Sequence, residues 1–198
     1  RSVRPTRGFP PLRETRAFGH QAMTTARDSS LAFSEAGLGG SSSRLHLRIG
    51  LDGPGSEVRV FGLYFGHRAQ THDYRYYVSH RAQHTNSSMY LKGAVGDDAR
   101  SVFTGLIRIE PEGQHADAMQ TNRNLVLSEG AQAHSVPNLE ILANEVRCGH
   151  GSAVGPLDAE QRYYLMSRVP SLLSWRVSCE GLPATKISSQ NADNNWTR

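Results

Sequence analysis

The sequence predicts an all-β fold, on three observations. Apolar residues alternate with polar or small ones over 45–51, which is the period of two that a strand with one buried face requires. Further short apolar runs follow at roughly even spacing, separated by glycine and proline. Almost no helical period occurs before Asp158. These patterns alone leave a β-sandwich, a β-barrel and a β-solenoid open.

Eight apolar runs form the predicted strands. Run 45–51 ends at the turn sequence Asp-Gly-Pro-Gly over 52–55. Run 58–65 is apolar on both parities, which is typical of a strand covered on both faces. No Asn-Gly hairpin signal joins neighbouring runs, so a sandwich is less favoured, and no strict repeat singles out a solenoid. The remaining runs are 74–78, 89–91, 102–109, 125–127, 139–142 and 146–150.

The two ends of the chain differ from this β-rich zone. Residues 1–19 hold three prolines and scattered arginines without a period, and we expect an irregular segment. Residues 158–168 form a predicted short helix, because Asp158 can cap its N-terminus. Residues 169–198 are rich in Ser and Asn, and we expect a disordered tail. The predicted β core is therefore 20–157.

Charge and cysteine content exclude several classes of protein. The formal charge is +4, from 22 Lys and Arg against 18 Asp and Glu, and much of the excess is scattered near the N-terminus. A nucleic-acid surface needs clustered cations interleaved with aromatic residues, so we expect no nucleic-acid partner. No apolar run approaches the ~18 residues of a membrane span. Two cysteines cannot build a disulfide framework, so we expect a cytoplasmic protein.

Cys148 and His150 are the most interesting pair for chemistry. If 146–150 is extended, both side chains lie on one face, ~6.6 Å apart along the strand. A thiolate and an imidazole so placed could contact one iron or one edge of an iron–sulfur cluster. Two ligands do not complete a site, so others would have to come from elsewhere in this chain or from a partner. The structural alternative is a packed cysteine beside a hydrogen-bonded histidine.

Enzyme classes with well-known motifs are not indicated. Neither a Gly-x-Ser-x-Gly elbow nor a phosphate-binding P-loop occurs. A β-solenoid enzyme acting on polysaccharides would need paired carboxylates on one exposed face. Its candidates, Asp97, Asp98, Glu110 and Glu112, fall in predicted turns, and we keep this class only as an alternative. The amide-rich stretch 120–124 is expected to satisfy backbone groups of turns.

Two long segments resemble the SufB/SufD family of the SUF system for iron–sulfur cluster assembly. They are QTNRNLVLSEGAQAHSVPNLEI over 120–141 and VRCGHGSAVGPLDAEQRYYLMSR over 146–168. Segments 33–45 and 60–66 are similar to the family as well, so the resemblance covers about 17–168. It implies a right-handed parallel β-helix. It also implies that SufD pairs with SufB through these cores, that the ATPase SufC drives conformational change, and that a transient cluster forms at the SufB–SufD interface.

The details resemble SufD more than SufB. SufB-like chains carry a functional cysteine where this chain has Ala131, and a His-Glu pair where it has His150 and Gly151. The resemblance therefore implies a non-enzymatic scaffold in which His150 takes part in cluster assembly as a candidate iron ligand. Cys148 is implied only as a supporting or structural residue. The family pattern ends at Arg168, so the resemblance implies a partial chain. It leaves open whether this chain docks SufC, which cluster is made and whether flavin binds.

Overall fold

A computed structural model describes residues 15–156 together with Glu160 and Tyr163. The chain divides into two units, Arg1–Pro156 and Leu157–Arg198, and the strands lie in the first. The described part contains ten strands: β1 Arg16–Thr25, β2 Ser30–Gly37, β3 Ser42–Leu51, β4 Glu57–Gly66, β5 Thr71–His80, β6 Asn86–Val95, β7 Arg100–Ile109, β8 Asp117–Val126, β9 Gln132–Ile141 and β10 Arg147–Pro156.

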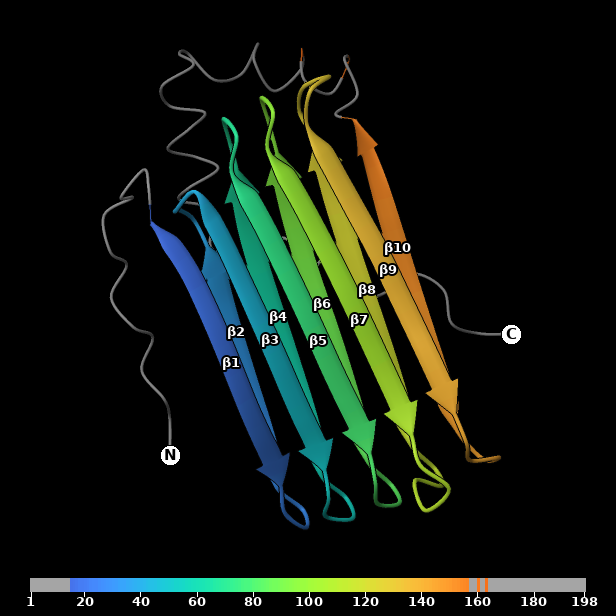
Figure 1. The fold of residues 1–198 in the computed structure, drawn as a ribbon. Helices are drawn as coiled ribbons and strands as arrows, with labels where there is room; N and C mark the ends of the chain where they lie inside the picture. Colours follow the sequence, from blue (N-terminus) through green and yellow to red (C-terminus); the bar gives the residue numbers. More distant parts are fainter. Residues whose placement is uncertain (1–14, 157–159, 161–162, 164–198) are drawn as a thin grey trace. The chain divides into compact units, whose positions relative to one another are not determined.

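The strands alternate between two five-stranded sheets. The odd strands form one sheet in the order β1-β3-β5-β7-β9, and the even strands form the other in the order β10-β8-β6-β4-β2. Every neighbouring pair is parallel. The chain therefore winds as a coil, crossing from one sheet to the other twice per turn (Figure 1). The expected all-β parallel β-helix is confirmed, as a β-solenoid of five coils.

The corners of the coil depend on residues in the left-handed backbone region. Between odd and even strands, Asp28, Gly55, His84 and His115 occupy equivalent positions, with φ from 52° at Asp28 to 70° at Gly55. Each N–H donates to a carbonyl of the next coil, as from Asp28 to Pro54 at 2.9 Å. At Gly55 a Cβ would come within 2.3 Å of Asp28 Oδ1, so a larger residue there would displace the Asp28 side chain. At the opposite corners, Gly40, Arg68 and Asp97 also have positive φ.

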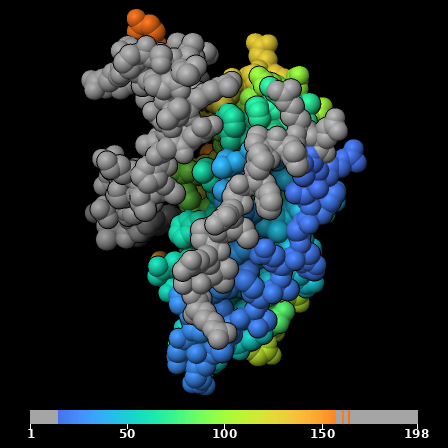
Figure 2. All heavy atoms as spheres, turned by 90° about the vertical axis from the view of Figure 1, so that its left-hand side faces the viewer, coloured from blue at the N-terminus to red at the C-terminus, as the bar shows by residue number. Residues whose placement is uncertain are grey.

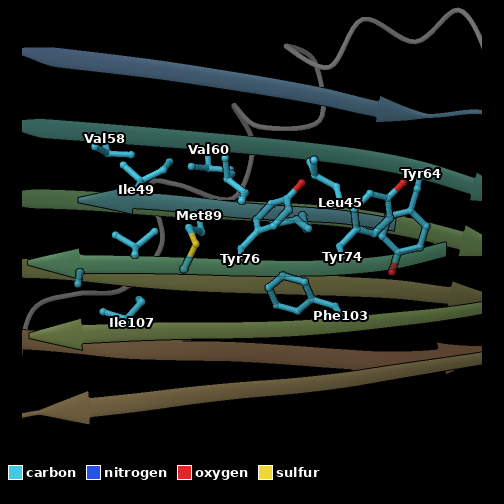
Figure 3. Packing of buried hydrophobic residues seen from close by; sticks show 14 of the residues in the cluster. Leu45, Ile49, Val58, Val60, Tyr64, Tyr74, Tyr76, Met89, Phe103 and Ile107 are labelled. Carbon is cyan, nitrogen blue, oxygen red and sulfur yellow. The ribbon is translucent and has the colours of Figure 1, made fainter. Parts of the chain in front are cut away.

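Equivalent positions on successive coils stack into ladders that form the core. Leu45, Tyr74 and Phe103 are in register across β3, β5 and β7, and all three are buried. Tyr76 meets the Phe103 ring edge to face, with ring centroids 5.9 Å apart. Figure 3 shows these rings between the two sheets. Because each inward position is enclosed by the coils on both sides, replacing a fully buried residue such as Leu47 with alanine would cost about 2–5 kcal/mol.

The strands extend further than the apolar runs predicted. β1 begins at Arg16, inside the segment 1–19 that was expected to be irregular. β1 and β2 escaped prediction because their coil is the first described one and its side chains are largely exposed (Figure 2). The expected helix 158–168 has only two described residues, Glu160 and Tyr163, both with helical backbone. Its other residues and the expected tail 169–198 lie outside the described residues.

The expectation for 120–124 is wrong. These residues lie in the middle of β8, not beside a turn. The three amide residues Gln120, Asn122 and Asn124 have the same strand parity as buried Ala118, and Gln120 is in register with buried Met89. All three amides are therefore buried inside the solenoid. An apolar pattern cannot identify a strand whose inward side chains are polar.

In the part of the chain that the structure describes, no helix is long and apolar enough to cross a lipid bilayer.

Candidate functional site on the terminal coil

The candidate pair lies on β10, at the edge of the even sheet. The parallel register places Cys148 beside Ala118 and His150 beside Gln120. Ala118 and Gln120 are buried and face the interior, so Cys148 and His150 share that interior-facing side of the strand. The sequence prediction that 146–150 is extended, with both residues on one face, is confirmed. Because β10 is the last described strand of its sheet, His150 is nevertheless exposed and Cys148 is half-buried.

Cys148 is held partly in the core. It packs against the buried apolar cluster, and it is a free thiol. Burial raises the pKa of this thiol, and the nearby carboxylate of Asp117 raises it further. The thiol is therefore protonated at neutral pH, and it becomes a metal ligand only if a metal displaces that proton. The packing observed at Cys148 agrees with the structural alternative considered from the sequence.

His150 differs from Cys148 in having no visible structural partner. Within 15–156, no side chain or backbone group hydrogen-bonds to its ring, and no carboxylate pairs with it. The imidazole nitrogens are therefore accessible to an incoming ligand or metal ion. The alternative of a histidine fixed by hydrogen bonds receives no support from the described residues.

A buried polar strip lies directly beneath the terminal coil. Gln120 is fully buried, and neither its amide nitrogen nor its amide oxygen has a hydrogen-bond partner among the described residues. Asn124 Nδ2 donates to Asn122 Oδ1 at 2.7 Å, and the Tyr64 hydroxyl bonds to Asn124. The sequence interpretation missed this strip, although the spacing Gln-x-Asn-x-Asn over 120–124 could have indicated one face of a strand.

The described residues do not assemble a complete metal site. No group of three His, Cys, Asp or Glu side chains in the described ranges could hold a metal ion. Cys148 and His150 thus supply two ligand atoms at most, as the sequence indicated. Ala131, which replaces the cysteine of SufB-like chains, is a buried residue before β9 and offers no ligand atom.

The carboxylates proposed for a polysaccharide-active site are separated. Asp97 and Asp98 precede β7, whereas Glu110 and Glu112 follow it, so the two groups lie at opposite ends of a ten-residue strand. Such a strand is roughly 33 Å long, far beyond the spacing of a catalytic carboxylate pair. Asp97 Oδ2 accepts the Arg68 N–H at 2.7 Å, and Glu110 pairs with Arg108 at 2.8 Å. These contacts give both acids structural roles.

Comparison with known proteins identifies the family. Residues 12–169 match the family model described as "SUF system FeS cluster assembly, SufBD core domain". The chain belongs to the SufB/SufD family. An iron–sulfur cluster assembly SufBD family protein of Mycobacterium leprae is 40% identical over 157 residues, which cover 75% of this chain and 40% of that protein. The match thus spans less than half the length of this SufB/SufD relative.

Two further SufB/SufD relatives carry the name of one paralogue. The iron–sulfur cluster assembly protein SufD of Escherichia coli is 36% identical over 152 residues, covering 76% of this chain and 36% of that protein. SufD of Bacillus subtilis is 36% identical over 103 residues, covering 52% of this chain and 24% of that protein. The solenoid described above therefore corresponds to the core domain of longer SufB/SufD proteins.

Proposed function

We propose that this chain is a SufD-like, non-enzymatic scaffold that presents His150 to a nascent iron–sulfur cluster at an interface with a SufB-like paralogue. The observation that carries the proposal is the position of His150, on the interior-facing side of the last described coil yet exposed and without a hydrogen-bond partner in 15–156. The similarity to two proteins named SufD supports the choice of paralogue, as does Ala131.

The chemistry of the terminal coil suits a shared site. A neutral imidazole is a good ligand for iron, and it needs no acid of its own chain to hold it. The cluster is the cargo of the scaffold and is assembled transiently, so ligands missing from this chain would come from the partner. The elevated pKa of Cys148 makes this thiol a weak ligand at neutral pH, and we assign it a supporting role beside His150.

The strands at this end also suit association with another chain. β9 and β10 are the outermost strands of their sheets in the described part, so each has one edge whose backbone groups face no neighbouring strand. Such edges pair readily with a strand of another protein. We place the SufB-like paralogue here, where pairing would bring its ligands next to His150. The chain would perform this scaffold role in the cytoplasm.

The test compares two histidines of the terminal coil. In a complex reconstituted with SufB and SufC, His150→Ala should abolish cluster formation, measured by visible absorbance and by iron and sulfide content. His134→Ala is the matched control, because His134 is exposed on β9 but lies on the outward parity. Both variants should retain the circular dichroism spectrum of the parent. Normal cluster yield from the His150 variant would refute the proposal.

A second experiment separates partnership from cluster chemistry. Co-purification with SufB and with SufC is measured for the full chain and for a version without residues 169–198. Retention of SufB by both versions supports an interface on the β-solenoid. Loss of SufB from the full chain itself, with the fold intact, would contradict the proposed pairing independently of His150.

A further inference from the structure

A hollow of about 340 Å³ lies on the outer face of the odd sheet and is lined by residues of β1, β3 and β5. Figure 1 shows these three strands side by side. These are the first described strands of the sheet, so the hollow is at the opposite end of the solenoid from His150. Its lining includes His20, Ala22, Arg48, Gly50, Tyr77 and Arg81. No function considered above uses these residues.

The hollow exists because small and long side chains meet in register. Ala22, Arg48 and Tyr77 occupy one ladder across three strands, and Gly50 lies in the neighbouring ladder. A Cβ at Gly50 would lie 2.9 Å from Asp52 Oδ1 and 3.3 Å from Arg81 Nη1, so the paired Asp52 and Arg81 side chains lie over the backbone of Gly50. Ala22 thus forms the open floor of the hollow, Arg48 and Tyr77 form its walls, and the Asp52–Arg81 pair covers Gly50.

The positive charge in this hollow is incompletely neutralised. Arg81 pairs with Asp52 at 3.1 Å. By contrast, no carboxylate of the described residues lies within ion-pair distance of Arg48, whose guanidinium carbon lies 5.3 Å from the centre of the Tyr77 ring. Stacking on an aromatic ring fixes the plane of a guanidinium while leaving its N–H edge free to donate.

Arg108, on the same outer face of the odd sheet, is neutralised by carboxylates. Arg108 on β7 pairs with Glu110 at 2.8 Å and with Glu140 at 3.1 Å. Arg108 therefore has two carboxylates, whereas Arg48 has none in the described part of the chain. Arg48 thus keeps its charge without a carboxylate of the described residues at the hollow, whereas Arg108 at an outward position of the same sheet does not.

His20 lines the hollow, and His46 is its register partner on β3. His20 and His46 stack with ring centroids 4.9 Å apart. Burial lowers the pKa of His46, and the neighbouring charges of His20, Arg48 and Arg75 lower it further. The place therefore disfavours an added proton, and an anion in the hollow would relieve that repulsion.

We propose that this hollow binds a small polyvalent oxyanion, either a phosphate ester or a di- or tricarboxylate, with Arg48 and Arg81 donating to its oxygens. Guanidinium groups match both kinds of oxyanion through paired N–H donors. The volume lies at the lower end of the range for small-molecule sites, which fits a metabolite and not a polymer. Arg48 and Tyr77 orient the anion, and the small side chain of Ala22 leaves room for it.

The test is isothermal titration calorimetry on the full chain with inorganic phosphate, pyrophosphate, AMP and citrate as probes. Saturable binding is expected for at least one probe, and its identity separates the phosphate from the carboxylate source. Ala22→Glu, which places a carboxylate on the floor, and Arg48→Gln should each weaken binding at least about tenfold. Arg123→Gln on the outward parity of β8 is the control and should leave binding unchanged.

Two results would overturn the proposal. One is the absence of saturable binding of all four probes up to about 10 mM, a concentration beyond the weakest useful affinities. The other is binding that Ala22→Glu and Arg48→Gln leave as tight as in the parent chain. Retained thermal unfolding midpoints of both variants ensure that a loss of binding reflects the hollow and not the fold.

Discussion

His150 lies in parallel register with Gln120, so the exposed imidazole stands directly above a fully buried amide. The same ladder continues inward through Met89 and Val60. The terminal coil thus connects an accessible ligand group to an interior in which Gln120 has no hydrogen-bond partner among the described residues. Predictions about this interior can be tested without assembling a cluster.

Gln120→Met should leave the free energy of unfolding unchanged or raise it by about 1 kcal/mol. Methionine nearly preserves the side-chain volume and removes two buried polar atoms whose desolvation is uncompensated. Urea unfolding followed by circular dichroism measures the change. A loss above about 1 kcal/mol would mean that a buried water molecule satisfies the amide, contrary to this expectation.

Gly93→Ala should destabilise the fold by about 1–3 kcal/mol. A Cβ at Gly93 would come within 2.1 Å of the buried Tyr64 ring, which cannot move away because it is enclosed between the sheets. Gly151→Ala is the control in the same sheet, since its nearest neighbouring atom would be 4.0 Å away. Thermal unfolding of both variants distinguishes them. Equal midpoints would show that the Tyr64 ring is less tightly held than the structure indicates.

His80 should make the protein sensitive to mild acid. Burial lowers the pKa of His80 to about 4 from 6.5, and its two ring nitrogens contact Thr85 Oγ1 at 2.7 Å and Ser87 Oγ at 2.8 Å. The unfolded chain therefore binds a proton that the folded chain refuses between these pH values, so stability falls as the pH drops from 6.5 to about 4. The loss is on the order of 3 kcal/mol.

The measurement for His80 is urea unfolding at several pH values across that window. His80→Phe should flatten the pH dependence, whatever its effect on stability at pH 7. Exposed His134 serves as the control, and His134→Phe should keep the parent slope. His72, whose pKa burial also lowers, contributes in the same direction and remains in both variants. An unchanged slope in His80→Phe would assign the acid sensitivity to other groups.

Tyr76→Phe should raise the pKa of Glu35. Burial raises this pKa already, and the hydrogen bond from the Tyr76 hydroxyl, at 2.8 Å, opposes that rise by stabilising the carboxylate. Losing the bond should cost about 1–3 kcal/mol at pH 7, where the carboxylate would be left without its donor. The cost should shrink as the pH falls and the native carboxyl protonates. Carboxyl ¹³C NMR titration measures the pKa, with Tyr90→Phe as the control.

Short-range patterns predicted some strands well and others poorly. The alternation over 45–51 corresponds to β3, since its inward residues are all apolar and fully enclosed. β8 was recognised only at its end, because Gln120, Asn122 and Asn124 fill inward positions that the apolar rule assigns to the outside. Periodicity also cannot tell which strand pairs with which, so the solenoid came from the family resemblance.

The two candidate sites also differ in how far the sequence alone could predict them. Cys148 and His150 lie two residues apart, so strand geometry alone placed them on one face. The hollow over β1, β3 and β5 combines Ala22, Arg48 and Tyr77, which are far apart in the sequence and meet only through the parallel register. No short sequence motif could therefore have predicted this hollow.

The ladder arrangement has a consequence for how this architecture can be regulated or diversified. Successive strands of a ladder are displaced by about 4.8 Å with unchanged direction, so the exposure of His150 depends on its position at the end of the ladder. Stacking one additional coil against β10 would enclose the imidazole as completely as Gln120 is enclosed, without altering any residue near it. The number of coils in the solenoid therefore decides whether the imidazole of His150 is exposed or buried.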